Sequence, residues 1–157
     1  MVFTQWNADT GGRVIAVAIR EYVAQHRDAW LVENLGTSAY FGLMATSAAM
    51  VGNSSSGLVE AASFRLPVVN VGDRQKGRVR PANVIDVDCD CHAVLAGIRR
   101  ATDPAFRRSL KNLTNPYRCG NASSIIVERL ATVALDKALT MKHFYDLTSE
   151  AAVVPCA

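Results

Sequence analysis

The chain has 157 residues, of which 50% are hydrophobic and 20% are charged, and its formal net charge is +3. This composition excludes a disordered or coiled-coil chain, and the length fits one domain with a buried core. The small net charge argues against a nucleic-acid partner, and no apolar run approaches the roughly 18–20 residues of a membrane helix, so no membrane partner is expected. The first residues lack the charged-then-apolar order of a signal peptide, which predicts a cytoplasmic protein.

Short apolar segments and turn residues alternate along the chain. The apolar runs predict strands at residues 2–6, 30–32, 48–51, 67–71 and 84–87. Apolar residues at helical spacing predict helices at residues 14–23, 40–44, 58–64, 92–101, 104–110 and 123–139. Because no two strands are joined by a two-residue hairpin, this order predicts a doubly wound α/β fold, with a single, largely parallel, Rossmann-like sheet over residues 1–140. Residues 148–157 carry no pattern and are predicted to form a disordered tail.

The cysteines do not indicate a disulfide scaffold or a metal site. They are few and scattered, at Cys89, Cys91, Cys119 and Cys156. The sequence Cys-Asp-Cys-His at residues 89–92 matches no usual zinc spacing, and no second pair of ligands is evident. We interpret these residues as reduced thiols at a strand end and expect neither a metal nor a cofactor.

A serine-rich loop, Gly52–Gly57, lies between a predicted buried strand and a predicted helix. In an open α/β sheet, ligands bind beyond the carboxyl ends of the strands, where this loop is expected. Small residues, three hydroxyls and the first N–H groups of the helix together favour a phosphate or diphosphate. The alternative is a structural one, in which one serine caps the helix and the others are solvated. The loop is not a Walker A motif, because no Gly-Lys-Ser/Thr follows it.

Two further features belong to the same edge of the predicted sheet. Glu60 lies one turn inside the helix, where a carboxylate could accept hydrogen bonds from the two hydroxyls of a ribose or could simply be a surface residue favoured by the helix dipole. The segment Gly72–Arg80 carries four cations between Arg74 and Arg80 and follows the next predicted strand. These cations could neutralise a diphosphate, or they could form a solvated basic loop or a nucleic-acid patch. No interleaved aromatic residues support stacking on a single strand, so nucleic acid is the weaker alternative.

The residues of these two loops resemble a known family. Val-Gly-Asn-Ser-Ser-Ser-Gly-Leu-Val-Glu at 51–60 and Gly-Asp-Arg-Gln-Lys-Gly-Arg at 72–78 are similar to the C-terminal lobe of UDP-N-acetylglucosamine 2-epimerases. The second segment favours the hydrolysing branch, which makes sialic-acid precursors. Flanking pieces agree over roughly residues 3–147, namely Asn-Ala-Asp at 7–9, Leu-Gly at 35–36, Asn-Pro-Tyr at 115–117 and Gly-Asn-Ala-Ser at 120–123.

The resemblance implies a fold and a set of site residues. The fold would be the C-terminal lobe of a two-lobed structure of the B-type glycosyltransferase kind, with residues 1–147 forming the UDP-binding lobe. Residue by residue, it implies that Ser54 and Ser55 bind the diphosphate, that Glu60 holds the ribose, that Tyr40 stacks on uracil, and that Asn7 and Arg74 line the same cleft.

The resemblance also implies a chemistry that this chain would share with another lobe. The family eliminates UDP from the sugar and then adds water, giving N-acetylmannosamine and UDP. The family's carboxylates lie on the other lobe, which would precede Met1, and this chain is about half of the expected length. We therefore expect UDP or UDP-N-acetylglucosamine as ligand, catalytic residues outside this chain, and an N-terminal lobe or a second copy as partner. The alternatives are the UDP-sugar-binding half of a split glycosyltransferase and a non-catalytic remnant that acts by interaction.

Two details at the end of elements complete these expectations. Arg65 stands where the family usually has Gly, at a helix end that commonly needs a left-handed backbone. Near the C-terminus, a group of apolar residues would lack cover without the other lobe and is expected to be mobile or to pair with another chain; its members are Leu135, Leu139, Met141, Phe144, Tyr145 and Leu147.

Overall fold

The computed structural model describes residues 1–4, 11–118 and 120–141. Within these ranges the strands are β1 (Val2–Thr4), β2 (Trp30–Val32), β3 (Met50–Gly52), β4 (Val68–Val71) and β5 (Val84–Val87). The α-helices are α1 (Gly12–Gln25), α2 (Gly36–Thr46), α3 (Ser56–Val59), α4 (Cys91–Thr102), α5 (Pro104–Ser109), α6 (Ala122–Thr132) and α7 (Lys137–Thr140). Two 3₁₀ helices, η1 (Ala61–Phe64) and η2 (Leu110–Asn112), follow α3 and α5. The predicted C-terminal tail lies outside the described residues.

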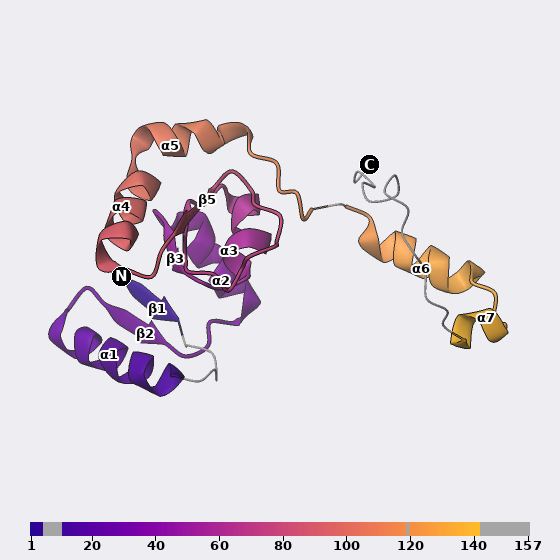
Figure 1. Ribbon diagram of the computed structural model, residues 1–157, viewed down its shortest axis with the longest axis horizontal. Helices are drawn as coiled ribbons and strands as arrows, with labels where there is room; N and C mark the ends of the chain where they lie inside the picture. Colours follow the sequence, from indigo (N-terminus) through magenta and orange to yellow (C-terminus); the bar gives the residue numbers. More distant parts are fainter. Residues whose placement is uncertain (5–10, 119, 142–157) are drawn as a thin grey trace.

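Every strand pair in these ranges is parallel, so the predicted α/β fold with parallel strands is confirmed. The strands form two sheets rather than the single predicted sheet, in the orders β1-β2 and β3-β4-β5. Residues of both β1 and β3 line one cavity of about 610 Å³, and no ladder joins these two strands. Helix α1 packs on β2, and α4 packs on β4 and β5 (Figure 1).

The central strand β4 has a different core on each of its two faces. Val68 packs with Met44 of α2, Ala61 of η1 and Leu66. Val69 points to the opposite face and packs with Ile85 of β5 and Ala101 of α4. This alternation follows from the period of two along a strand, and it gives the three-stranded sheet a helical layer on both faces.

The loop between β5 and α4 has a structural explanation. Asp90 is the N-cap of α4, and its Oδ1 accepts hydrogen bonds from the backbone N–H groups of His92 and Ala93 at 2.9 and 3.0 Å. Cys89 and Cys91 on either side are exposed, free thiols. The described residues contain no group of three or more His, Cys, Asp or Glu side chains arranged to hold a metal ion. Asp90, in the middle of the Cys-Asp-Cys-His run, starts helix α4.

Two predicted helices differ from those in the structure. The helix expected at 58–64 is one turn of α-helix followed by the 3₁₀ helix η1, which ends at Arg65 in the left-handed region with φ of 53°. The helix expected at 123–139 is broken, because α6 ends at Thr132 and Asp136 starts α7 as its N-cap. An aspartate whose side chain accepts the first N–H groups of a helix begins a new helix more readily than it continues an old one.

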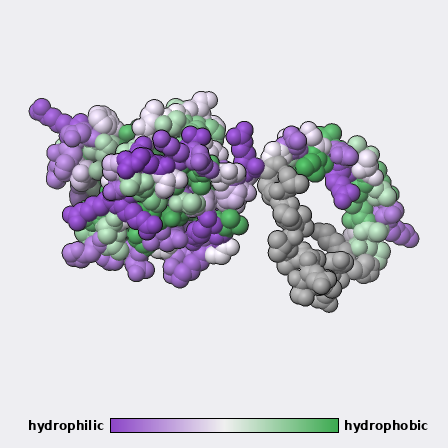
Figure 2. All heavy atoms as spheres, turned by 90° about the horizontal axis from the view of Figure 1, so that it is seen from above, coloured by the Kyte–Doolittle hydropathy of each residue, from purple (hydrophilic) through white to green (hydrophobic). Residues whose placement is uncertain are grey.

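Helices α6 and α7 stand apart from the rest of the chain. An extended segment leads from η2 to α6, which lies away from both sheets (Figure 1). Figure 2 shows this part beside the larger body, with apolar side chains on its surface. Neither helix contains a buried residue. Among the described helices, none has the length and apolar character required to span a membrane.

Candidate functional site

The loops that follow β3 and β4 meet at the carboxyl edge of the three-stranded sheet. The side chain of Gln75 donates from Nε2 to the backbone oxygen of Asn53 at 2.7 Å, although the two residues are 22 positions apart. Arg74 also reaches this oxygen, with its Nη1 at 3.5 Å. The serine-rich loop and the basic loop thus form one surface at the place where α/β sheets bind ligands.

The serine hydroxyls do not form a regular helix cap. Ser55 occupies the N-cap position of α3 without a side-chain hydrogen bond to the helix. Ser54 Oγ lies 3.4 Å from the backbone nitrogen of Ser56, which is a long contact, and 3.3 Å from Ser56 Oγ. The structural alternative, in which one serine caps the helix, is thus represented only by the long contact of Ser54 Oγ with the backbone nitrogen of Ser56.

Ser54, Arg74 and Tyr40 line one cavity of about 610 Å³. It lies between the β1–α1 region and the β3–α2 region, and its other walls include Gly52, Asn53 and Ile15. The cation and the hydroxyl in this lining suit an anionic group, and the apolar lining residues suit a less polar one.

Glu60 lines a neighbouring cavity of about 450 Å³. Tyr40 and Ser56 also line it, and Glu33 and Asn34 come from the segment after β2. Glu60 Oε2 is buried, and among the described residues no donor lies within hydrogen-bond distance of it. A buried carboxylate oxygen without a donor is costly, so this atom is suited to accept a hydrogen bond from a ligand.

Tyr40 connects the two cavities, because its side chain lines both of them. Its hydroxyl lies 2.6 Å from Ser56 Oγ, and its ring centroid lies 6.4 Å from that of Phe41. The hydrogen bond to Ser56 holds the end of the Tyr40 ring against the serine-rich loop.

The structure therefore brings together most of the residues singled out in the sequence. Tyr40, Ser54, Glu60 and Arg74 line the two adjacent cavities, whereas Ser55 lines neither. Asn7 lies outside the described residues. Sequence reasoning did not assign roles to Ser56 and Gln75. The sequence does mark both residues, because Ser56 is the third serine of the run and Gln75 lies between two basic residues. Their hydrogen-bond partners, Tyr40 and Asn53, are distant in sequence and could not be predicted.

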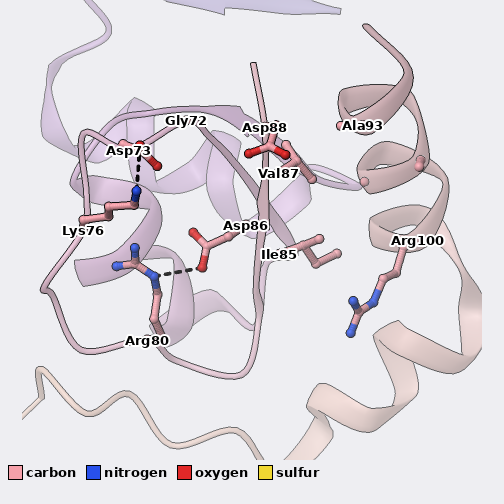
Figure 3. A pocket seen from close by; sticks show the side chains of 12 residues that line it. Gly72, Asp73, Lys76, Arg80, Ile85, Asp86, Val87, Asp88, Ala93 and Arg100 are labelled. Carbon is pink, nitrogen blue, oxygen red and sulfur yellow. Dashed lines mark hydrogen bonds and ion pairs between the residues drawn. The ribbon is translucent and has the colours of Figure 1, made fainter. Parts of the chain in front are cut away.

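A third cavity, of about 590 Å³, lies on the other side of the basic loop, between β5 and α4 (Figure 3). Its charged lining includes two ion pairs, Lys76 with Asp73 at 2.7 Å and Arg80 with Asp86 at 3.0 Å. Asp88 and Arg100 also line it. Cations and carboxylates are mixed here, so the charge of this cavity favours no single class of ligand.

Comparison with known proteins places the chain in a family. Residues 1–131 match the family described as UDP-N-acetylglucosamine 2-epimerase. The chain belongs to this family. It is 34% identical over 146 residues to polysialic acid biosynthesis protein P7 of Escherichia coli, covering 93% of this chain and 37% of that protein. It is 42% identical over 137 residues to the UDP-N,N'-diacetylbacillosamine 2-epimerase (hydrolyzing) of Legionella pneumophila, covering 87% of this chain and 35% of that protein.

A solved structure of the family has the same fold. The UDP-GlcNAc 2-epimerase of Neisseria meningitidis, bound to UDP-GlcNAc, is similar with a TM-score of 0.60 at 23% identity, covering 85% of this chain and 37% of that one. The present chain therefore spans little more than a third of the length of these relatives. The sequence predicted about half of the full length.

Proposed function

We propose that this chain is the UDP-binding lobe of a hydrolysing UDP-N-acetylglucosamine 2-epimerase. The observation that carries the proposal is the meeting of the serine-rich and basic loops beside two cavities lined by Tyr40, Ser54, Glu60 and Arg74. The Legionella pneumophila relative is named as a hydrolyzing 2-epimerase, and so is a Campylobacter jejuni protein that is 45% identical over 87 residues, covering 55% of this chain and 23% of that protein. These names support the hydrolysing branch. The fold shared with an epimerase solved with UDP-GlcNAc supports the nucleotide-sugar ligand.

The proposed ligand contacts follow from the chemistry of each side chain. Ser54, Ser55 and Arg74 bind the diphosphate, because hydroxyl donors and a guanidinium match its oxygens and its charge. Glu60 accepts hydrogen bonds from the ribose hydroxyls with its buried, unpaired Oε2. Tyr40 stacks on the uracil ring, and its hydrogen bond to Ser56 fixes its orientation.

The proposed reaction eliminates UDP to give a 2-acetamidoglucal and then adds water to give N-acetylmannosamine. It needs acid–base groups on the sugar side of the ligand. Asp73 forms an ion pair with Lys76, and Glu60 is assigned to the ribose, so neither supplies such a group. We therefore assign the catalytic carboxylates to an N-terminal lobe or to a second copy that completes the cleft.

The test of the UDP site is calorimetric titration of the chain with UDP. We expect weak binding, because the proposed lobe forms only one wall of the cleft, and we expect it to be lost in the Ser54→Ala/Ser55→Ala/Glu60→Ala variant. The matched control is Ser123→Ala/Ser124→Ala/Glu128→Ala, which makes the same three changes on exposed positions of α6. Equal UDP affinity of the site variant and the control would contradict the assignment. Absence of binding at millimolar UDP in the folded chain would favour the non-catalytic interpretation.

Coupled UDP release from UDP-N-acetylglucosamine tests whether the acid–base groups lie outside this chain. We expect no turnover by the chain alone and recovery when a separately expressed N-terminal lobe is added. Turnover by the chain alone that disappears in Asp73→Asn would show that the acid–base chemistry resides here.

The sugar itself has a second candidate. Two relatives, 42% and 45% identical, are named for UDP-linked or GDP/UDP-linked N,N'-diacetylbacillosamine. That sugar nucleotide and UDP-N-acetylglucosamine share the uridine diphosphate on which the site residues above act. Comparing kcat/KM for the two substrates in the reconstituted enzyme distinguishes them.

A further inference from the structure

Arg80, the last residue of the basic loop Gly72–Arg80, joins this loop to strand β5. Its Nε donates to Asp86 Oδ2 at 3.0 Å, in the ion pair drawn in Figure 3. Its Nη1 donates to the backbone oxygens of Gln75 and Arg78, at 2.6 and 3.2 Å. One guanidinium therefore ties strand β5 to two points of the loop, which its planar array of donors allows and a lysine would not.

The contacts of Arg80 continue in both directions. Toward the sheet, Asp86 Oδ1 accepts from Asn70 Nδ2 at 2.6 Å, and Asn70 is fully buried in the central strand β4. Toward the site, Gln75 is 3% exposed and donates to the backbone oxygen of Asn53 at 2.7 Å. We call the resulting chain of contacts, Asn70, Asp86, Arg80, Gln75 and Asn53, the loop-anchoring network. It connects the middle of the sheet to the serine-rich loop.

Arg74 is the neighbour of Gln75 and the proposed diphosphate ligand, so the network sets its position. The loop has two glycines in left-handed conformation, Gly72 with φ of 72° and Gly77 with φ of 81°. Glycine allows many backbone conformations, and a loop with two of them needs other contacts to define its shape. The pair of Lys76 with Asp73 is exposed on both sides and contributes little to this.

We propose that Arg80 is a positioning residue, which holds the basic loop so that Arg74 and the Ser54 hydroxyl face the same diphosphate. The inference rests on the proposed UDP site and adds to it a residue that lines a different cavity and does not touch the ligand. Precise placement of charged donors determines how much of their interaction with an anion is realised.

The test compares UDP and uridine binding by NMR titration of the whole chain. In Arg80→Met we expect UDP to bind about tenfold more weakly, with uridine binding unchanged, because only the diphosphate contacts depend on the loop. Arg80→Lys should bind UDP almost as weakly as Arg80→Met, since an ammonium cannot reproduce the array of donors. Arg99→Met in α4 is the control, because it removes the same charge from an exposed position away from the loops.

A double-mutant cycle with Arg74→Met separates positioning from general electrostatics. If Arg80 acts through Arg74, the double variant binds UDP no more weakly than Arg74→Met alone. Additive losses, unchanged UDP affinity in Arg80→Met, or a parallel loss of uridine binding would each overturn the inference. Wild-type chain that binds no UDP would instead overturn the proposed function.

Asp86→Asn is a second variant for the case in which Arg80→Met does not fold. It breaks the ion pair and retains a side chain of the same shape beside Asn70, and we expect the same selective loss of UDP binding. Failure of both variants to fold would show that the pair holds the sheet together rather than the loop, which contradicts the inference.

Discussion

The three-stranded sheet with its helices and the α6–α7 segment both contain many apolar residues but differ in how far they bury them. In the first region Leu58, Ala61 and Val69 are completely buried. In the second, the large apolar side chains are mostly exposed, with Ile126 at 56% and Leu130 at 71%. Both regions thus have the apolar periodicity that predicts helices, but only the first buries the apolar side chains of its helices.

This difference indicates where the chain obtains its stability. Burial of an apolar side chain contributes about 1.5–3 kcal/mol, whereas helix propensity contributes only tenths of a kcal/mol per residue. Nothing among the described residues buries the apolar side chains of α6, so their burial would require atoms outside these residues. The chain spans little more than a third of the length of its relatives, and the partner lobe proposed above would supply such atoms.

The largest expected effect comes from removing one leucine side chain in each region. Leu58→Ala should lower the free energy of unfolding by about 2–5 kcal/mol, because it leaves a cavity where a completely buried side chain was. Leu130→Ala in α6 should change it by less than about 0.5 kcal/mol. Urea denaturation followed by circular dichroism measures both. Equal losses in the two variants would mean that α6 is packed as firmly as the sheet.

The second effect concerns a close approach of helix and sheet. A Cβ on Gly97 of α4 would lie 2.8 Å from Val69 Cγ1 and 2.9 Å from Val87 Cγ1. Gly97→Val should therefore destabilise the chain by about 1–3 kcal/mol through overpacking. The matched control is Gly42→Val in α2, where no atom lies within 4 Å of the added Cβ and a small stabilisation is expected from helix propensity. Thermal unfolding of the two variants checks the difference, and a tolerated Gly97→Val would mean that α4 can move off the sheet.

The third prediction is a substitution that raises the free energy of unfolding. Arg65 has a left-handed backbone with φ of 53°, as its position at a helix end predicted from the sequence. Arg65→Gly should stabilise the chain by about 1 kcal/mol, because glycine adopts this conformation without strain. Arg99→Gly, inside α4, should destabilise it by a similar amount. Destabilisation in both variants would show that contacts of the Arg65 side chain outweigh its backbone strain.

These positions also show which features the sequence could predict. Strands β2 and β5 have the predicted bounds, because short runs of apolar residues between turn residues define them locally. The division into two sheets was not predictable, since it depends on how far β1 lies from β3 in space. Helix α6 was predicted too long, because periodicity continues past Thr132 and the competing cap at Asp136 went unrecognised.

The candidate site likewise has features that the sequence could predict and features that it could not. Its loops could be predicted, because polar residues after two parallel strands meet at one edge. The hydrogen bonds that shape it could not, because Gln75 with Asn53 and Tyr40 with Ser56 are each joined across 16 or more positions. Such pairs depend on the completed fold, and no local pattern marks them.

The smallest expected change in stability tests what covers α6. We expect the chain to self-associate through α6, because contiguous exposed apolar surface favours a partner. Ile126→Lys/Leu130→Lys should reduce the apparent mass in light scattering to that of one chain and change the free energy of unfolding by less than about 0.5 kcal/mol. Val14→Lys/Val17→Lys is the control, because it places the same charges on exposed apolar positions of α1. A wild-type chain that is monomeric at all concentrations would rule out α6 as a surface between copies, and loss of association in the α1 control as well would assign the effect to added charge alone.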